Sequence, residues 1–202
     1  MSEKFGRLIR TISYLHFRQM IGQLINRLPG KPYTHLQFKA DVARPCNVEF
    51  IIKHHSLSEY HLAFLNQSSP FISWNDASNG MLWAYNLNYM DWLVQEDISF
   101  EEGAAWIDRF IADLPENKVG LDPYPTALRI INWIKFISIH YDEIEHERLK
   151  VWNDSLYSQY IHLSRNLEYH LLGNHLLEDA YALFIASIYF SDEKLYNKVK
   201  RL

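Results

Sequence analysis

The sequence has 202 residues, of which 48% are hydrophobic and 15% are aromatic. A chain of this length and composition buries a sizeable core, so it is folded and not intrinsically disordered. Its net charge of −4 argues against general nucleic-acid binding, and no uninterrupted apolar run reaches the length of a transmembrane segment.

The first 31 residues are locally basic, with six basic side chains and one acidic side chain. Hydrophobic residues recur at helical spacing and predict an amphipathic helix, but charges interrupt them too often for a signal peptide. This helix either lies on an anionic membrane surface or packs on the domain, and we favour packing. Without a signal peptide, and with Cys46 as the only cysteine, the cytoplasm is the favoured compartment.

Residues 33–80 are the least regular part of the sequence. Their composition predicts one short strand over residues 48–52 and one short helix over residues 57–65, separated by loops. Three histidines, His54, His55 and His61, lack cysteine or carboxylate neighbours at ligand spacing, apart from Glu59, so no metal site is expected. Residues 1–80 are therefore interpreted as a basic N-terminal helix and an irregular lead-in segment.

From residue 82 onward the pattern is helical. Apolar residues three and four apart predict helices over residues 100–114 and 149–167, and residues 124–141 are apolar on most sides, which predicts a buried helix. Prolines and glycines mark short loops, so successive helices are expected to pack as antiparallel hairpins in one domain with the lead-in. Periodicity leaves a bundle, an α-solenoid and a toroid of helical hairpins open for residues 81–202, and the absence of a strict repeat argues against a regular solenoid.

Residues 173–184 begin a further helix with a polar pair at its start. Gly173 ends the preceding pattern, and Asn174 is expected to cap the helix. Backbone N–H groups at a helix N-terminus bind anions, and Asn174 and His175 add donors there, with a neutral imidazole still donating one hydrogen bond. The alternative is that Asn174 is only a cap and His175 only a solvated neighbour.

Three segments, in this order, resemble the heparinase II/III-like polysaccharide lyases. Asn174-His175 and the residues after it are similar to the family's Asn-His segment. Residues 82–89 (LWAYNLNY) resemble its Leu-Trp-x-Tyr-Asn-Leu-His-Tyr segment, with Asn88 where the family has His. Residues 123–133 (PYPTALRIINW) resemble its Pro-Tyr-x-x-x-x-Arg-x-x-Asn-Trp segment. The resemblance extends from about Phe71 to the end of the sequence.

The resemblance implies an all-α fold, an incomplete α/α toroid built from antiparallel helical hairpins. It also implies a chain that binds uronate-containing polysaccharides, which such lyases cleave by β-elimination without a cofactor. Asn174 and His175 would bind the uronate carboxylate and disperse the charge that develops on it. The side chains expected to contact the substrate, although core roles are equally open for them, are Arg129, Tyr124, Trp83, Tyr89 and Trp133.

The sequence departs from the family after the Asn-His pair. The similar enzymes use a later Tyr-His segment for acid–base chemistry and continue into a C-terminal β-region, whereas 28 residues follow Asn174 here and contain no Tyr-His pair. We therefore expect a fragment or a shortened relative that is inactive alone. The alternative is a non-catalytic α-helical scaffold that binds a glycan or a protein partner along its concave face.

Overall fold

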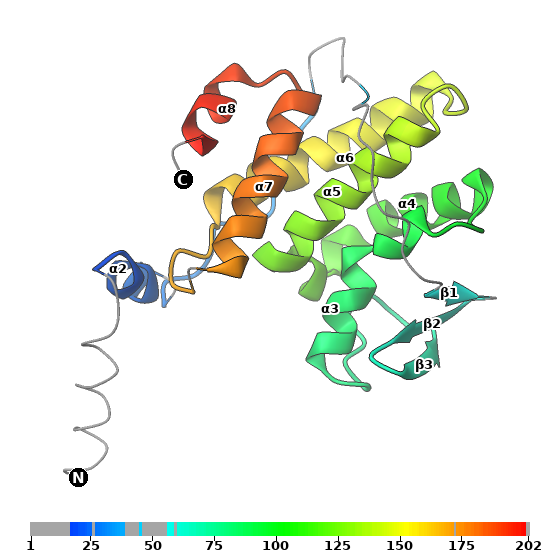
Figure 1. Cartoon of the computed structure of the whole chain (residues 1–202), viewed down its shortest axis with the longest axis horizontal. Helices are drawn as coiled ribbons and strands as arrows, with labels where there is room; N and C mark the ends of the chain where they lie inside the picture. Colours follow the sequence, from blue (N-terminus) through cyan, green and yellow to red (C-terminus); the bar gives the residue numbers. More distant parts are fainter. Residues whose placement is uncertain are drawn as a thin grey trace.

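The computed structural model describes residues 17–25, 27–38, 45, 56–58, 60–171 and 173–200. Helices dominate this part of the chain, and its strands form one small antiparallel sheet (Figure 1), which confirms the helical class predicted from residue 82 onward. The elements are α2 (Phe17–Ile25), β1 (Leu57–Ser58), β2 (His61–Phe64), β3 (Gln67–Pro70), α3 (Met81–Tyr89), η1 (Asp91–Val94), α4 (Phe100–Asp113), η2 (Leu114–Glu116), η3 (Val119–Leu121), α5 (Pro123–Ile139), α6 (His146–Arg165), α7 (Asn174–Tyr189) and α8 (Glu193–Val199).

Helix α5 is the centre of the helical region. It packs against α3, α6 and α7, and in Figure 1 it lies between α7 and α3. Side chains on most of its sides are buried, including Ile130, Ile134 and Ile137, as the apolar pattern of residues 124–141 predicts. Pro123 begins the helix at the position where its missing N–H has no intrahelical partner in any case.

Large aromatic side chains fill the core beside α5. Many of them meet edge to face, as in the pairs Trp74–Phe110 (4.8 Å between ring centroids) and Phe110–Trp133 (5.5 Å). This geometry places the positive edge of one ring against the negative face of another and adds about 0.5–1.5 kcal/mol per pair beyond area burial. The fully buried aromatic residues of this core include Trp74, Trp83, Trp92, Trp133, Trp152, Phe110 and Phe136.

The helix predicted over residues 57–65 is wrong, because this segment forms β1 and β2 of the sheet. Leu62 and Phe64 are buried while the residues between them are exposed, a period of two that fits a strand with one buried face. The register pairs Phe64 with Gln67, and the two loop residues between them both have positive φ. This is the backbone of a tight hairpin turn, which determines the pairing.

A buried amide joins the hairpin to the helical region. Gln95 follows η1 directly and is 5% exposed. Its Oε1 accepts from the backbone N–H groups of Ser56 and Leu57 (3.1 Å each), and its Nε2 donates to the Leu57 carbonyl (2.9 Å). The side chain thus completes a β-type pairing for the lead-in. The strand predicted over residues 48–52, as well as His54 and His55, lies outside the described residues.

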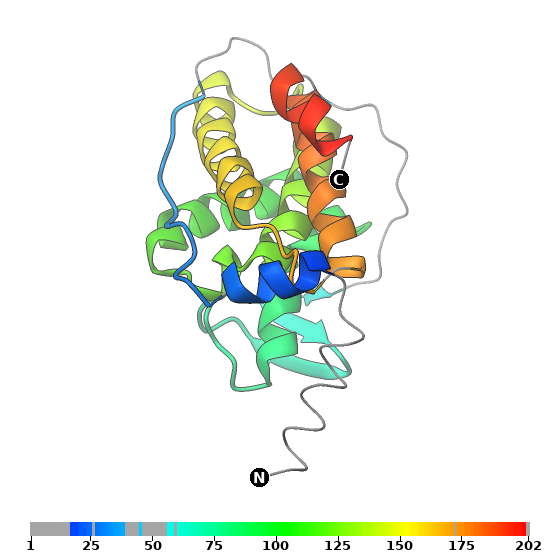
Figure 2. The same cartoon turned by 90° about the vertical axis from the view of Figure 1, so that its left-hand side faces the viewer.

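The N-terminal part packs along α6. Helix α2 crosses the turn between α6 and α7, where Gly22 comes so close to the backbone of Tyr169 and His170 that a Cβ atom would clash. The segment after α2 runs antiparallel to α6 (Figure 2). Its backbone N–H groups donate to α6 side chains: Lys31 to Asn166 Oδ1 (2.9 Å), Leu36 to Ser158 Oγ (2.8 Å) and Phe38 to Asp154 Oδ1 (2.7 Å). Among the described helices, none is long and apolar enough to cross a membrane.

Candidate functional site

The start of α7 differs from the predicted cap. Gly173, with φ of 66°, is the N-cap residue, and Asn174 is already the first residue of the helix. This φ together with ψ of −136° is a combination that glycine adopts readily and other residues do not, so the chain turns at Gly173, and no side chain in the described part of the chain caps this helix. Asn174 is exposed, and its amide has no hydrogen-bond partner within the described part of the chain. The capping role predicted for Asn174 is therefore wrong, and its side chain is available to a ligand.

His175 is held between an acid and an aromatic ring. Its Nδ1 lies 3.0 Å from Glu168 Oε2, and its ring centroid lies 4.4 Å from that of Tyr124. A carboxylate only accepts hydrogen bonds, so Nδ1 carries a proton, and whenever the ring is neutral Nε2 is an acceptor. The donor expected from a neutral imidazole is thus already used by Glu168. The remaining nitrogen offers a proton-accepting site on a side chain that is 41% exposed.

Tyrosines from α3 and α5 lie near His175 and Tyr124. Tyr89 lies beside Tyr124, with 5.8 Å between ring centroids, and the Tyr85 hydroxyl donates to Asp122 Oδ2 (2.7 Å). Burial, followed by the Asp122 carboxylate, raises the pKa of Tyr85 to about 12. Burial and the neighbouring Tyr124 also raise the pKa of Tyr89. Both phenols therefore keep their protons at neutral pH and present donors, not bases.

A buried acid supports the loop that carries Glu168. Asp179 is fully buried on α7, and its Oδ2 accepts the backbone N–H of Glu168 (3.0 Å). Its Oδ1 is buried without a hydrogen-bond partner. Burial raises the pKa of Asp179 to about 7; the Glu168 N–H opposes this rise and the Glu168 carboxylate adds to it. The Asp179 side chain thus holds the loop in position, and with it Glu168, the acid that orients His175.

Arg129 is a structural residue and not a substrate contact. It is fully buried on α5, over the Phe110 ring at 4.3 Å, and burial lowers its pKa to about 9. Its donors are used internally: Nε to Gln159 Oε1 (2.7 Å), Nη1 to the Asn88 carbonyl (3.0 Å), and Nη2 to the Gly120 carbonyl (2.7 Å) and Thr126 Oγ1 (3.4 Å). The substrate-binding role expected for Arg129 is corrected, because no solvent reaches the guanidinium.

Two of the aromatic residues expected to contact the substrate, Trp83 and Trp133, are also structural. Trp83 and Trp133 are almost fully buried, at 1% and 0% exposure, so they belong to the core. The indole N–H of Trp83 donates to the Gln67 carbonyl (3.2 Å), and that of Trp133 to Met90 Sδ (3.2 Å). Of the aromatic residues expected to contact a sugar, Tyr124 packs against His175 and is partly exposed, whereas Tyr89 packs against Tyr124 and is itself buried, at 8% exposure.

The two upstream segments that resemble lyases contact each other. One face of α5 bonds to the end of α3 and to Met90, the residue after it. Arg129 donates to the Asn88 carbonyl, Asn132 Nδ2 to the Tyr89 carbonyl (3.0 Å) and Trp133 to Met90 Sδ. The bonds from Arg129 and Asn132 satisfy two carbonyls that the end of a helix leaves without intrahelical partners. The segments therefore contribute a scaffold beneath the Asn174-His175 pair.

Asn88 belongs to the same scaffold. Its Nδ2 donates to the carbonyls of Trp74 (2.7 Å) and Ala84 (2.9 Å), and its Oδ1 accepts from Asn117 Nδ2 (2.9 Å). The side chain is fully buried. At this position, where the similar lyases have His, the chain thus has a saturated structural amide.

Glu168, Asp122 and Asp179 are site residues that sequence reasoning missed. Glu168 precedes the Tyr169-His170 pair in the loop between α6 and α7, and Asp122 precedes the segment that resembles lyases. Asp179 follows His175 by four residues, which places both on one helix face and is the one signal available from spacing. The described residues contain no group of three or more His, Cys, Asp or Glu side chains arranged to hold a metal ion.

Comparisons with family models, with curated proteins and with solved structures give no match for this chain. The candidate site is therefore defined by its own geometry: an unpartnered amide, an oriented histidine and protonated tyrosines at the N-terminus of α7.

Proposed function

We propose that the chain is the substrate-binding N-terminal region of a heparinase II/III-like polysaccharide lyase and binds uronate-containing polysaccharides at the start of α7. The observation that carries the proposal is the pairing of Asn174, an exposed amide for which the described residues provide no hydrogen-bond partner, with His175, whose Nδ1 is held by Glu168. The proposal includes the finer architecture, in which the helical hairpins form part of an incomplete α/α toroid.

The arrangement supports a division of tasks between the two residues. The Asn174 amide and the backbone N–H groups at the α7 N-terminus are donors for a carboxylate, and the helix dipole favours its negative charge. Elimination also requires a base for the proton at C5, which is a weak acid even beside a carboxylate. Nε2 of neutral His175 is a proton acceptor beside those donors, so His175 is assigned to the proton and Asn174 to the carboxylate.

Tyr124 completes a surface suited to a sugar ring, and the buried Tyr89 packs against it. The Tyr124 ring packs on the His175 imidazole and is partly exposed, so one sugar face can lie on it. The raised pKa of Tyr89 keeps its hydroxyl a hydrogen-bond donor. Acidic polysaccharides combine apolar ring faces with carboxylates, and both features have counterparts at this site.

The test of the proposal is isothermal titration calorimetry with uronate oligosaccharides and with the same oligosaccharides after reduction of their carboxyl groups. The acidic ligand is expected to bind at least about ten-fold more tightly, because a hydrogen bond to a charged group contributes roughly 1.5–3 kcal/mol. Equal affinity for both ligands contradicts the proposal. It would favour the α-helical scaffold with a different partner, since such a scaffold has no need of the carboxylate.

The 202-residue chain is expected to bind without cleaving. A base at His175 is not sufficient, because elimination also needs an acid that protonates the leaving oxygen. The resemblance assigns acid–base chemistry to a Tyr-His segment, and none follows His175 in this sequence. Incubation with heparan, alginate and related polymers should release no unsaturated uronate ends. Turnover that is abolished by replacing Tyr181 or Tyr189 would contradict this expectation.

A further inference from the structure

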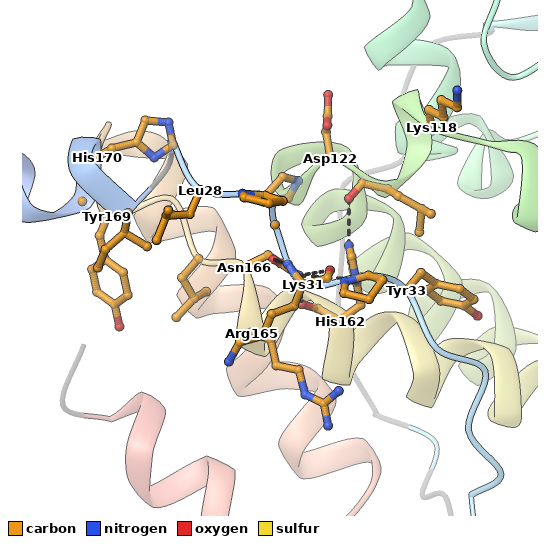
Figure 3. Close-up of a pocket in the computed structure, with 18 of the residues that line it drawn as sticks. Leu28, Lys31, Tyr33, Lys118, Asp122, His162, Arg165, Asn166, Tyr169 and His170 are labelled. Carbon is orange, nitrogen blue, oxygen red and sulfur yellow. Dashed lines mark hydrogen bonds between the residues drawn. The ribbon is translucent and has the colours of Figure 1, made fainter.

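A second concave site lies apart from His175. A pocket of about 720 Å³ is enclosed by α2, the segment of residues 28–33, the last turns of α6 and the junction of η3 with α5 (Figure 3). This volume is within the range of about 300–1,000 Å³ that is usual for small-molecule sites. The pocket is bordered by Asp122, yet neither Asn174 nor His175 lines it.

One part of the pocket is strongly apolar. Ile21, Ile25 and Leu28 line it from the N-terminal side, and Leu121 and Leu167 line it from the helical region. Ile25 and Leu28 are 61% and 65% exposed. Large aliphatic side chains that are exposed and gathered around a cavity mark a surface that a ligand covers.

The charges around the pocket are mostly positive. Lys31, Lys118 and Arg165 line it, against Asp122 as the one acidic lining residue, and Asp122 accepts the Tyr85 hydroxyl. In the part of the chain that is described, none of the three cations forms an ion pair. Lys31 lies next to Arg165, because its backbone bonds to the neighbouring Asn166; Figure 3 shows both side chains extending to the same side, away from Lys118 and Asp122.

Two neutral polar side chains of the pocket, His162 and Asn166, already bond to the protein. His162 Nε2 donates to the Leu121 carbonyl (3.0 Å), and burial lowers the pKa of His162, so the ring is neutral. The Asn166 amide bonds to the backbone of Lys31 on both its oxygen and nitrogen sides (2.9 and 3.2 Å). These two side chains therefore belong to the fold, whereas the pocket's apolar side chains and its three cationic groups, which form no such bonds within the described residues, face a ligand.

We propose that this pocket binds an amphipathic anion: a single aliphatic chain that ends in a phosphate or carboxylate. The chain lies against Ile21, Ile25 and Leu28, and the anionic group lies at Lys31 and Arg165. This ligand position differs from the uronate site proposed above, and Asp122 borders both sites. Its ligand is recognised by apolar contact together with charge, and not by hydrogen bonds to hydroxyl groups.

The experiment is calorimetric titration of the chain with decyl phosphate below its micelle-forming concentration, beside decanol and inorganic phosphate. Decyl phosphate is expected to bind at least about ten-fold more tightly than either reference, because only it satisfies both parts of the pocket. Affinity for decanol or for inorganic phosphate equal to that for decyl phosphate overturns the proposal. So does binding to vesicles of anionic phospholipid without binding of monomeric decyl phosphate, which would place the ligand in a membrane surface.

Variants locate the site. Arg165→Gln and Lys31→Gln are each expected to weaken decyl phosphate binding by up to about five-fold, the usual effect of one exposed charge pair. Leu28→Asp, at an exposed position, should abolish binding, whereas Lys150→Gln, an exposed α6 change outside the pocket, should leave it unchanged. Circular dichroism of each variant verifies the fold. Unchanged binding in Leu28→Asp overturns the proposal, and uronate affinity measured on the same variants separates this result from the fate of the uronate site.

Discussion

Two polar residues on neighbouring helices, Arg129 on α5 and His175 on α7, show how similar sequence signals lead to different roles. Arg129 is fully buried, and it bonds to four protein groups from α3, η3, α5 and α6. His175 is 41% exposed, and its Nε2 forms no hydrogen bond within the described residues. Both lie in segments that resemble lyases. A polar side chain whose hydrogen bonds are all used internally stabilises the fold, and one with a remaining group can meet a ligand.

The largest effect on stability is expected from replacing Arg129. Arg129→Met leaves the carbonyls of Asn88 and Gly120 buried without these donors, so the free energy of unfolding should fall by about 3–5 kcal/mol. Urea denaturation measures this change. Arg148→Met is the matched control, since Arg148 forms an exposed pair with Asp108 and its loss should change stability by less than about 1 kcal/mol. Similar losses in both variants would contradict a special role for Arg129.

Asp179 adds a pH dependence beneath the His175 site. Its pKa is about 7 in the folded chain, against 3.8 for the free side chain, so the unfolded state releases this proton first. The contribution of Asp179 to the free energy of unfolding is fully present below about pH 4. It is lost as the pH rises to 7, by up to about 4 kcal/mol. Asp179→Asn should remove that loss, so that the variant gains stability over the natural chain at pH 8 and not at pH 4. Urea denaturation at both pH values measures it, and parallel pH profiles for the two proteins would contradict the assignment.

The smallest effect on stability is expected from replacing Glu168, the acid that orients His175. Glu168→Gln replaces a group that only accepts with an amide that also donates, so the Nδ1–H tautomer of His175 loses its preference. Imidazole ¹⁵N chemical shifts should show one tautomer in the natural chain and a mixture in the variant. Stability should change by less than about 1 kcal/mol, because the His175–Glu168 pair is partly exposed. One unchanged tautomer in Glu168→Gln would show that the acid does not orient the ring.

The sequence was sufficient for the long helices and insufficient for the short elements. Apolar spacing predicts α4, α5, α6 and α7, because each runs for several turns with one or more buried faces. Residues 57–65 are too short for periodicity to separate a helix from the β1–β2 hairpin, and the two positive-φ residues of the turn, Leu65 and Asn66, are not a standard turn pair.

In the candidate site, too, some features are local and can be predicted from the sequence, and others are not. Asn174 and His175 are predicted from their position at a helix start, which is a local property, and from the resemblance to lyases. The burial of Arg129 and Trp133 depends on α3 packing over α5, and the Glu168–His175 contact depends on the fold of the loop before α7. These are tertiary contacts, so spacing along the sequence carries no signal for them.

The most direct test of the uronate site is calorimetry with uronate oligosaccharides on two α7 variants and a core control. Asn174→Ala should weaken binding by roughly ten-fold to a hundred-fold, the effect of losing a donor to a charged group, and His175→Ala by about two-fold to ten-fold, since its neutral ring accepts one hydrogen bond. Leu183→Ala, at a position that is 1% exposed, should lower thermal stability and leave affinity intact. Unchanged oligosaccharide affinity in both Asn174→Ala and His175→Ala would contradict the account and make the pair a structural feature of the helix start.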